Sequence, residues 1–440
     1  MPALVSDRAI HLFVGLLMGL AVYGLMENAE WLRENAHVAY PGWVLALFWP
    51  TLLLLGYRRG HGLRGLGWVS GFCALLVLLA FYTGWQAPPL DDDSFLPDWL
   101  AFALGDTFGW SMVIACFVAL IHLQPAIWGS DRDYATVFGL SWRNFLTVFL
   151  SGLLALGVWL VTVLWGNLFT LFEKDWFMCP ILGMSFALGL NSFATASSII
   201  DRVSILLSRF FWLLLPILAL ATTCFLLALP FTGLQPLWDS NFGTGLLMAA
   251  SVWGLFFLNA VYQTGERLPY ARTVHRALSV AILLFPVLVG LAAYGLALHI
   301  AQDGWTPAHC WTLLNVVLIA LFSLGYAAAI AWRRDDWPSV LPRINHPMSW
   351  VVLASLLLTA SPLLDFRTLS AWSHFARVES GELPVEDLDP DHVRELGRPG
   401  RIKLDALRRK ATRRRPLPCA PDLPRARKSA DGRRDSWPGS

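Results

Sequence analysis

The first 364 residues alternate long apolar runs with short polar connections. A bilayer core about 30 Å thick takes about 20 apolar residues to cross as a helix, and an unpaired backbone amide in lipid is costly. The runs do not alternate apolar with polar residues, as the strands of a barrel would. They predict eleven spanning helices: Ala9–Met26, Gly42–Tyr57, Leu66–Trp85, Phe108–Trp128, Asn144–Trp165, Met178–Ile200, Phe210–Leu229, Thr244–Thr264, Ala277–Ile300, Trp311–Trp332 and Met348–Leu364.

This pattern predicts an all-α fold, a polytopic transmembrane helix bundle over residues 1–364 followed by a short polar C-terminal segment. Gly42–Tyr57 is the least regular span because it is short and contains Pro50. Asp7 and Arg8 precede the first run, and no clear A-x-A cleavage site follows it. We therefore predict that the first run is a retained helix and not a secretory signal peptide.

Basic residues are distributed unevenly between alternate connections. Every second connection is rich in arginine, and these arginines form a basic set. The connections between them carry only Arg33 and Lys174, together with acidic stretches such as Asp91–Asp93. Because cytoplasmic loops retain positive charge, the basic set predicts a cytoplasmic N-terminus, and eleven spans then predict a periplasmic C-terminus in a bacterial inner membrane. The basic set has fourteen members: Arg8, Arg58, Arg59, Arg64, Arg132, Arg143, Arg202, Arg209, Arg267, Arg272, Arg276, Arg333, Arg334 and Arg343.

The segment after the last predicted span carries helical signals of its own. In "DPDHVREL", Asp389 is a suitable N-cap, Pro390 suits the first helical position, and Gly397 is placed to end a helix of one or two turns. Just upstream, four apolar residues recur at helical spacing and predict a short amphipathic helix on the membrane surface: Leu369, Trp372, Phe375 and Ala376. We assign residues 365–407 to this periplasmic segment.

Residues 408–440 are rich in Arg and Pro and nearly free of large aliphatic residues, so we predict a disordered tail. Residues 365–440 hold 17 Lys+Arg and 12 Asp+Glu, whereas the preceding 364 residues hold 16 and 19. The abrupt change in composition near residue 407 motivates the hypothesis that the tail arises from a shifted reading frame. An external location argues against nucleic acid as a partner of this basic tail.

Composition agrees with a membrane protein. The chain is 56% hydrophobic and 15% charged, against roughly 25% charged residues in soluble domains. Its 22 Trp fit two membrane interfaces, where indole rings settle at the level of the headgroups. The six Cys form no CxxC pair and four lie in apolar runs, so neither a disulfide framework nor a zinc site is predicted.

Polar residues within the spans are the candidate binding positions. His122, three residues before Pro125, is either a proton relay or ligand, or a histidine bonded to a backbone carbonyl that the proline frees. "LNSFATASS" contains Asn191, Ser192 and Thr195, which either line a cavity or form interhelical hydrogen bonds.

Two further pairs recur at helical spacing. Asn259 and Gln263 are four residues apart near the end of a span and predict an amide-bearing helix face for a partner, a lipid headgroup or a neighbouring helix. Gly15 and Gly19 form a GxxxG motif, which predicts close packing inside the bundle or, alternatively, dimerisation.

The sequence carries no constellation of residues typical of catalysis. It has no HExxH, Walker or GxSxG motif, and His and Cys are not at metal-ligand spacing. No acidic residue lies near the middle of a predicted span, where ion-coupled transporters usually place one. We therefore predict no enzyme activity, no cofactor and no metal.

Three segments in the second half resemble the bacterial multi-pass membrane family catalogued as Domain of Unknown Function 4153. They are "LNAVYQTGE", "HIAQDGWTPAHCWTLL" and "SPLLDFRTLSAWSHFARVESGELPVEDLDPDHVRELGR", and the likeness covers roughly residues 250–405. The family tends to have aromatic residues where this chain has Leu388, Pro390 and His392. The resemblance implies an integral inner-membrane protein of no established biochemical role, and it supplies no catalytic residues.

Two functional hypotheses follow from these observations. The first is an accessory, scaffold or envelope-associated protein that lies in the lipid bilayer and acts through other membrane or periplasmic proteins. The alternative is a transporter or channel for an uncharged or lipid-like solute, which would use the polar faces of the sixth and eighth predicted spans.

Overall fold

The structure, a computed structural model, describes residues 2–58, 61–88, 102, 107–166, 169–233, 243–266, 268–382, 384 and 390–414. Within these residues the chain is helical and contains no β-strand. The predicted all-α fold is therefore confirmed. The N-cap assigned to Asp389 and most of the tail assigned to residues 408–440 lie outside the described residues.

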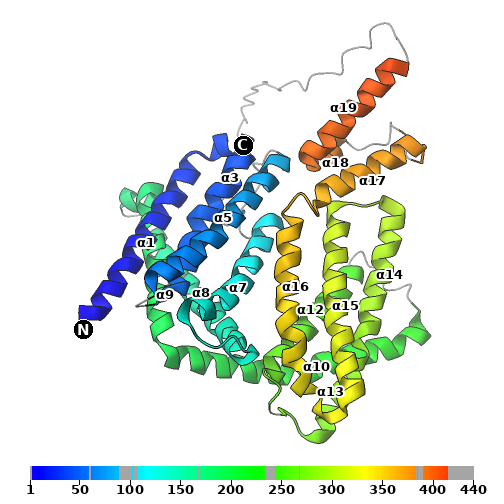
Figure 1. The fold of residues 1–440 in the computed structure, drawn as a ribbon, viewed down its shortest axis with the longest axis horizontal. Helices are drawn as coiled ribbons and strands as arrows, with labels where there is room; N and C mark the ends of the chain where they lie inside the picture. The colour runs from blue at the N-terminus through cyan, green and yellow to red at the C-terminus, as the bar shows by residue number, and fades with distance from the viewer. Residues whose placement is uncertain are drawn as a thin grey trace, which may run out of the picture.

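The helices of the first half follow the predicted order (Figure 1). They are α1 Pro2–Glu27, α2 Ala29–Glu34, α3 Ala36–Trp43, the π-helical turn η1 Val44–Phe48, α4 Trp49–Gly56, α5 Gly62–Gln86, α7 Thr107–Trp128, α8 Tyr134–Gly166, the 3-10 turn η3 Thr170–Glu173 and α9 Asp175–Thr195.

The second half continues with α10 Ser197–Thr232, α12 Gly243–Tyr262, α13 Arg272–Leu283, α14 Phe285–Asp303, α15 Pro307–Arg333, the 3-10 turn η4 Arg334–Val340 and α16 Leu341–Thr359. Three helices follow the bundle: α17 Phe366–Ser380, α18 Pro390–Glu395 and α19 Gly397–Arg414. We call these three helices the C-terminal cap.

Ten uninterrupted helical runs among the described residues are long and apolar enough to cross a membrane. The last run, Pro307–Thr359, contains two of the eleven predicted spans, because η4 turns the chain back and α16 lies beside α15 (Figure 1). The apolar runs therefore form a polytopic helix bundle, as predicted.

The second span differs from its predicted bounds because it begins at Ala36 and not at Gly42. Pro50 has no N–H for the carbonyl four residues earlier, and the π-helical turn η1 lies just before it, so the helix continues past the proline.

The sixth span also differs from the prediction. Met178–Ile200 is not one helix, because α9 ends at Thr195, Ala196 leaves the helical conformation, and α10 begins at Ser197. The polar stretch that we expected inside a single span therefore covers the end of α9 and the break before α10.

Helix α7 lies at the centre of the packing. Of the most apolar 18 residues in each span, 72% are buried in α7 and at most 44% in any other. Its neighbours are α4, α5, α8 and α16. Helix α10 connects this first group to the second, because it contacts α8 and α9 as well as α12 and α13. In Figure 1 α10 crosses the lower part of the molecule.

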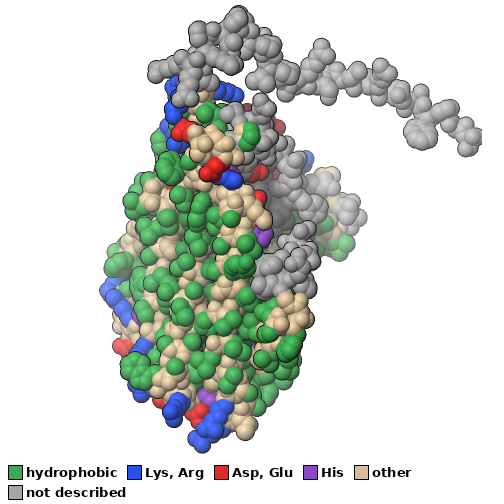
Figure 2. All heavy atoms as spheres, turned by 90° about the vertical axis from the view of Figure 1, so that its right-hand side faces the viewer, with side chains coloured by type: hydrophobic (Ala, Val, Ile, Leu, Met, Phe, Trp, Pro, Cys, Tyr) green, Lys and Arg blue, Asp and Glu red, His purple; other side chains and the backbone are tan. Residues whose placement is uncertain are grey.

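The outer surface has the polarity of a membrane protein. Figure 2 shows hydrophobic side chains over the middle of one face, with charged side chains of both signs at its lower and upper ends. Large apolar residues point outward from many helices, including Leu78, Leu164, Leu220 and Leu246, each at least 64% exposed. Such a band suits contact with lipid.

Gly15 and Gly19 pack against α9. A Cβ at Gly15 would lie 2.6 Å from the carbonyl oxygen of Gly183, and one at Gly19 would lie 2.5 Å from Cα of Pro180. Gly183 faces the same contact from the other side, where an added Cβ would meet Gly15 and Gly19. The small residues let the two backbones approach closely, as in other membrane helix pairs.

We expect Gly19→Ala to lower the free energy of unfolding by about 1–3 kcal/mol, because the added methyl group overpacks the α1–α9 contact. Gly24→Ala on the same helix is the matched control, since an added Cβ there meets nothing within 4 Å. Thermal unfolding of both variants in detergent measures the difference. Equal stability of the two variants would contradict this packing.

Candidate functional site

Four helices meet at a buried polar network near the basic end of the bundle. Asn345 of α16 donates from Nδ2 to the Tyr134 hydroxyl (2.9 Å) and to Oδ1 of Asn259 (2.6 Å). The Tyr326 hydroxyl of α15 donates to Oδ1 of Asn345 over 2.6 Å. Asn259 of α12 donates from Nδ2 to the Tyr326 hydroxyl (3.0 Å) and to the Leu255 carbonyl (2.8 Å).

The amide N–H donors of this network are all used. A side-chain amide has two N–H donors and one carbonyl acceptor. Both donors of Asn259 and both donors of Asn345 are engaged, and each amide oxygen accepts at least one bond. No amide donor is left over for a ligand. The network therefore joins α8, α12, α15 and α16 rather than lining a path.

A second cluster fixes η4 against α13. Trp337 is fully buried, donates from Nε1 to Ser279 Oγ (2.9 Å) and stacks on His275 with the rings 6° from parallel. His275 Nε2 lies 3.0 Å from the Asp335 carbonyl, which only accepts, so Nε2 carries the proton. Nδ1 then accepts from the Tyr262 hydroxyl at 2.9 Å.

Two further contacts hold η4 in place, an ion pair and the close approach of a glycine. Arg276 donates to both carboxylate oxygens of Asp335, from Nε at 3.0 Å and from Nη2 at 2.7 Å. Gly265 has φ of +77° and lies so close to the Pro338 carbonyl that a Cβ would clash with it. Residues of the "LNAVYQTGE" segment, Tyr262 and Gly265, therefore serve to pack the end of α12 against η4.

Gln263 does not share a helix face with Asn259 as predicted. Helix α12 ends at Tyr262, and Gln263 has a φ of 51°, in the left-handed region. Its backbone N–H donates to the Asn259 carbonyl (3.0 Å), while its side chain is exposed. The turn that Gly265 completes ends the helix one residue too early for the expected amide face.

His122 bonds a side chain and not the carbonyl that we expected Pro125 to free. Its Nε2 lies 2.8 Å from Ser349 Oγ, and the Ser349 hydroxyl donates to the His346 carbonyl (2.6 Å), so Nε2 is the donor. The ring stacks on Trp350 with centroids 4.1 Å apart. His122 therefore fastens α7 to α16.

Beside it, Gln124 and Asn144 form an amide pair between α7 and α8. Gln124 Nε2 donates to Asn144 Oδ1 (3.1 Å) and to the Leu55 carbonyl (2.9 Å), and Asn144 Nδ2 donates back to Gln124 Oε1 (2.8 Å). Sequence reasoning missed both residues. The available signal was their polarity within long apolar runs.

Asn191, Ser192 and Thr195 lie where α9 ends. Thr195 Oγ1 donates to the Asn191 carbonyl (2.9 Å), Ser192 is exposed, and Arg143 of α8 donates to the nearby Ala194 carbonyl (2.9 Å). The hydrogen bonds described for these residues do not join them to the Asn259 network. Of the three side chains, Thr195 bonds the end of α9 through the Asn191 and Ser192 carbonyls.

The C-terminal cap covers the opposite end of the bundle. Asp365 caps α17 by accepting from the Arg367 N–H (3.0 Å), and its carboxylate also accepts from the Tyr82 hydroxyl of α5 (3.0 Å). Phe366 meets Trp311 edge to face at 5.2 Å. Helix α17 thus buries Phe366 and Phe375, whereas Leu369 and Trp372 are exposed, so the predicted amphipathic face is divided between the bundle and the surface.

Helix α19 is fastened to α5 and to α17. The Arg398 guanidinium lies 3.5 Å above the centroid of the Trp85 ring. Gly397, with φ of +65°, lies against the Gln86 carbonyl with no room for a Cβ. Lys410 bonds Glu379 over 2.7 Å and holds the pKa of that carboxyl below its ordinary value. Helix α19 continues to Arg414, past the boundary predicted after residue 407.

Comparison with known proteins gives no relative for this arrangement, since no family model, curated protein or solved structure matches the chain. Within the described residues, no group of three or more His, Cys, Asp or Glu side chains is placed to hold a metal ion. What is established about this protein therefore comes from its own geometry.

We expect Asn345→Ala to lower the free energy of unfolding by about 2 kcal/mol, because it removes three interhelical hydrogen bonds at roughly 0.6 kcal/mol each. Asn315→Ala is the matched control, since Asn315 is exposed and bonds only the Trp311 carbonyl of its own helix. Equilibrium unfolding in detergent compares the two. A loss as large for Asn315→Ala as for Asn345→Ala would disprove the role of the network.

We expect Arg398→Gln to loosen the cap, because it removes the cation that lies over Trp85. Hydrogen–deuterium exchange of α18 and α19 should become at least fivefold faster, as about 1 kcal/mol of cation–π attraction is lost. Arg401→Gln, at a neighbouring exposed position, should leave exchange unchanged. Unchanged exchange in Arg398→Gln would show that the cation–π contact does not hold the cap.

Proposed function

We propose that this protein is a non-catalytic scaffold of the bacterial inner membrane that acts through partners bound at its C-terminal cap. The observation that carries the proposal is the contrast between the bundle and the cap. The polar side chains around Asn259, His122 and Gln124 in the bundle are bonded to neighbouring helices, whereas the cap is a docked, folded part of the chain with polar and apolar side chains exposed.

The cap offers a surface suited to a protein partner. Trp372 and Ile402 are 63% and 53% exposed, and Arg401, Arg409 and Lys410 are exposed on α19. Exposed aromatic residues beside Arg are the composition that protein interfaces favour. Because the cap is fastened to α5 and α15 of the bundle, a bound partner would be held at a fixed place relative to the membrane.

The proposed orientation places the N-terminus in the cytoplasm and the cap in the periplasm. This orientation is supported by the distribution of arginine. Residues near the ends of spans, such as Arg58, Arg143, Arg276 and Arg343, lie at one end of the bundle, and the cap lies at the opposite end of the bundle. Cytoplasmic loops retain positive charge. Membership of the family Domain of Unknown Function 4153 is part of the same proposal and rests on the three sequence segments.

The alternative, a transporter for an uncharged or lipid-like solute, requires a polar path to Asn191 or Asn259. Asn259 has no amide donor left for a solute, and Asn191 lies at the end of α9. The hydrogen-bond pattern therefore favours a scaffold.

Alkaline phosphatase, which is active only outside the cytoplasm, tests the orientation. We expect a fusion after Arg414 to be active and a fusion after Ser130, between α7 and α8, to be silent. The reverse pattern, or a silent fusion after Arg414 with good expression, would overturn the proposed topology.

Site-specific photocrosslinking in cells tests the scaffold role. A photoreactive residue at Ile402 or Trp372 should give protein adducts, because both positions are exposed on the cap. The control position is Leu220, which is 65% exposed on the apolar surface of α10 and should meet lipid. Adducts from Leu220 alone, or none from the cap, would refute a partner at the cap.

A further inference from the structure

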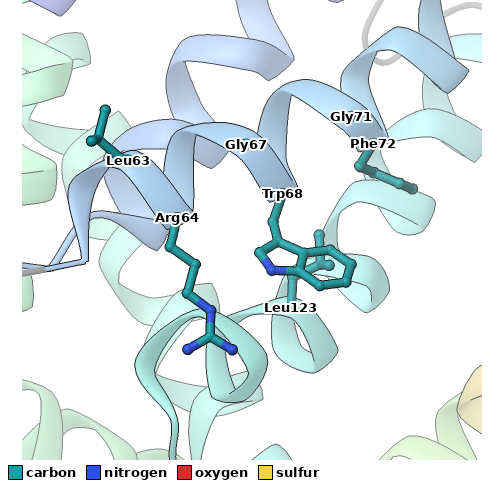
Figure 3. A pocket seen from close by; sticks show the side chains of 7 residues that line it. All are labelled: Leu63, Arg64, Gly67, Trp68, Gly71, Phe72 and Leu123. Atoms are coloured by element: carbon teal, nitrogen blue, oxygen red, sulfur yellow. The ribbon is translucent and has the colours of Figure 1, made fainter.

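The surface of the bundle is hollowed between α5 and α7 at the basic end. The hollow has a volume of about 630 Å³, within the range of ligand pockets, and is open on one side. Most of its wall is apolar, and one residue in it is charged (Figure 3). It is lined by Leu63, Arg64, Gly67, Trp68, Gly71 and Phe72 of α5 and by Leu123 of α7. We call it the α5–α7 groove.

The groove lies on a helix face that meets lipid. Leu63, Leu75 and Leu78 are 88%, 42% and 68% exposed on α5. Trp68 is half exposed and lies one turn from Arg64, an arrangement typical of the membrane interface, where indole rings lie near cations at the level of the headgroups. The groove therefore runs from headgroup depth at Arg64 toward acyl-chain depth at Phe72.

Two glycines, Gly67 and Gly71, keep the groove open, and neither is needed for close contact with another helix of the bundle. A Cβ added at Gly67 or at Gly71 would meet nothing within 4 Å. By contrast, Gly84 on the same helix lies against the Ala36 backbone, with no room for a Cβ. Glycine in a helix interior costs about 1 kcal/mol relative to alanine, so its absent side chain here leaves space for something outside the chain.

The charged residue at the mouth, Arg64, has no partner among the described residues. Arg64 makes no hydrogen bond or ion pair with any residue that the structure describes, and its side chain is exposed. Figure 3 shows Arg64 and Trp68 extending from α5 beside Leu123 of α7. Arg58, whose guanidinium lies 5.7 Å from the centroid of the Trp128 ring, adds positive charge at the same end.

We propose that the α5–α7 groove binds an anionic phospholipid of the leaflet at the basic end, with the phosphate at Arg64 and an acyl chain along Gly67 and Gly71. A guanidinium matches phosphate geometry, and basic pockets between membrane helices bind anionic headgroups. A two-fold dimer formed through this groove would bring two Arg64 guanidinium groups together, which disfavours a second copy of the chain as the occupant. The proposal requires only that the helices lie in a bilayer and is independent of any partner at the cap.

Photolabelling in nanodiscs tests this site with the intact protein. The probe is phosphatidylglycerol with a diazirine in its acyl chain, diluted into phosphatidylcholine. We expect labelling concentrated on Leu63–Phe72 and around Leu123 in the wild type. Arg64→Gln should reduce it about fivefold, since a basic residue near an anionic membrane surface contributes about 1 kcal/mol. Gly67→Leu combined with Gly71→Leu should abolish it by filling the groove, while native mass spectrometry follows folding and oligomeric mass.

Two matched variants separate the groove from general effects. Arg209→Gln removes an exposed arginine of the same basic set from α10, and Gly152→Leu fills a helical glycine of α8 where a Cβ also meets nothing within 4 Å. Both should label like the wild type. Equal labelling by a diazirine phosphatidylcholine, an equal loss in Arg209→Gln, or a dimer that the glycine variants dissociate would each overturn the proposal.

Discussion

The structure depends on one constraint, which is that a bilayer core offers no water to hydrogen-bond the backbone. Each amide that crosses it must be paired within its own segment, so the chain repeats one element, the long helix. Apolar surface gives little preference for helix–helix contact over lipid, since lipid tails are as apolar as leucine. Close packing and polar contacts must then decide which helices become neighbours.

Close backbone packing and polar contacts are both present, in different parts of the bundle. Gly15, Gly19 and Gly183 bring the α1 and α9 backbones together. Near the basic end, Asn259 and Asn345 with two tyrosines join four helices through amides whose donors are all used. His122 and Gln124 fasten α7 to its neighbours in the same way. Polar groups in this bundle therefore act mainly as structural links.

The two ends of the molecule carry different functional potential. At the basic end, Arg64 has no partner in the part of the chain that the structure describes and lies at the mouth of an apolar groove, which suits an anionic lipid. At the other end, Arg398 and Gly397 fix a folded cap against α5, and Trp372 and Ile402 stay exposed. A scaffold that holds a partner at a set height above the membrane would use such a cap, and a bound lipid would steady the helices beneath it.

The sequence by itself determined the helices, their approximate bounds, the turns of α17 and α18 and the uneven distribution of arginine. These follow from local properties, namely apolar length, capping residues and charge. It also singled out Asn259, His122 and the two glycines, because polar or small residues in an apolar run are visible without a structure.

Only the tertiary structure decided what those residues do. Asn345 bonds Asn259 and Tyr134, which lie 86 and 211 residues away, and Tyr326 bonds Asn259 over 67 residues. No local pattern encodes such pairing. The predicted amide face failed because Gln263 adopts a positive φ in a turn that closes against Pro338. The α5–α7 groove likewise exists only because α7 lies beside α5. Membrane helices have similar apolar compositions. Contacts between residues distant in sequence therefore decide which helices pack together.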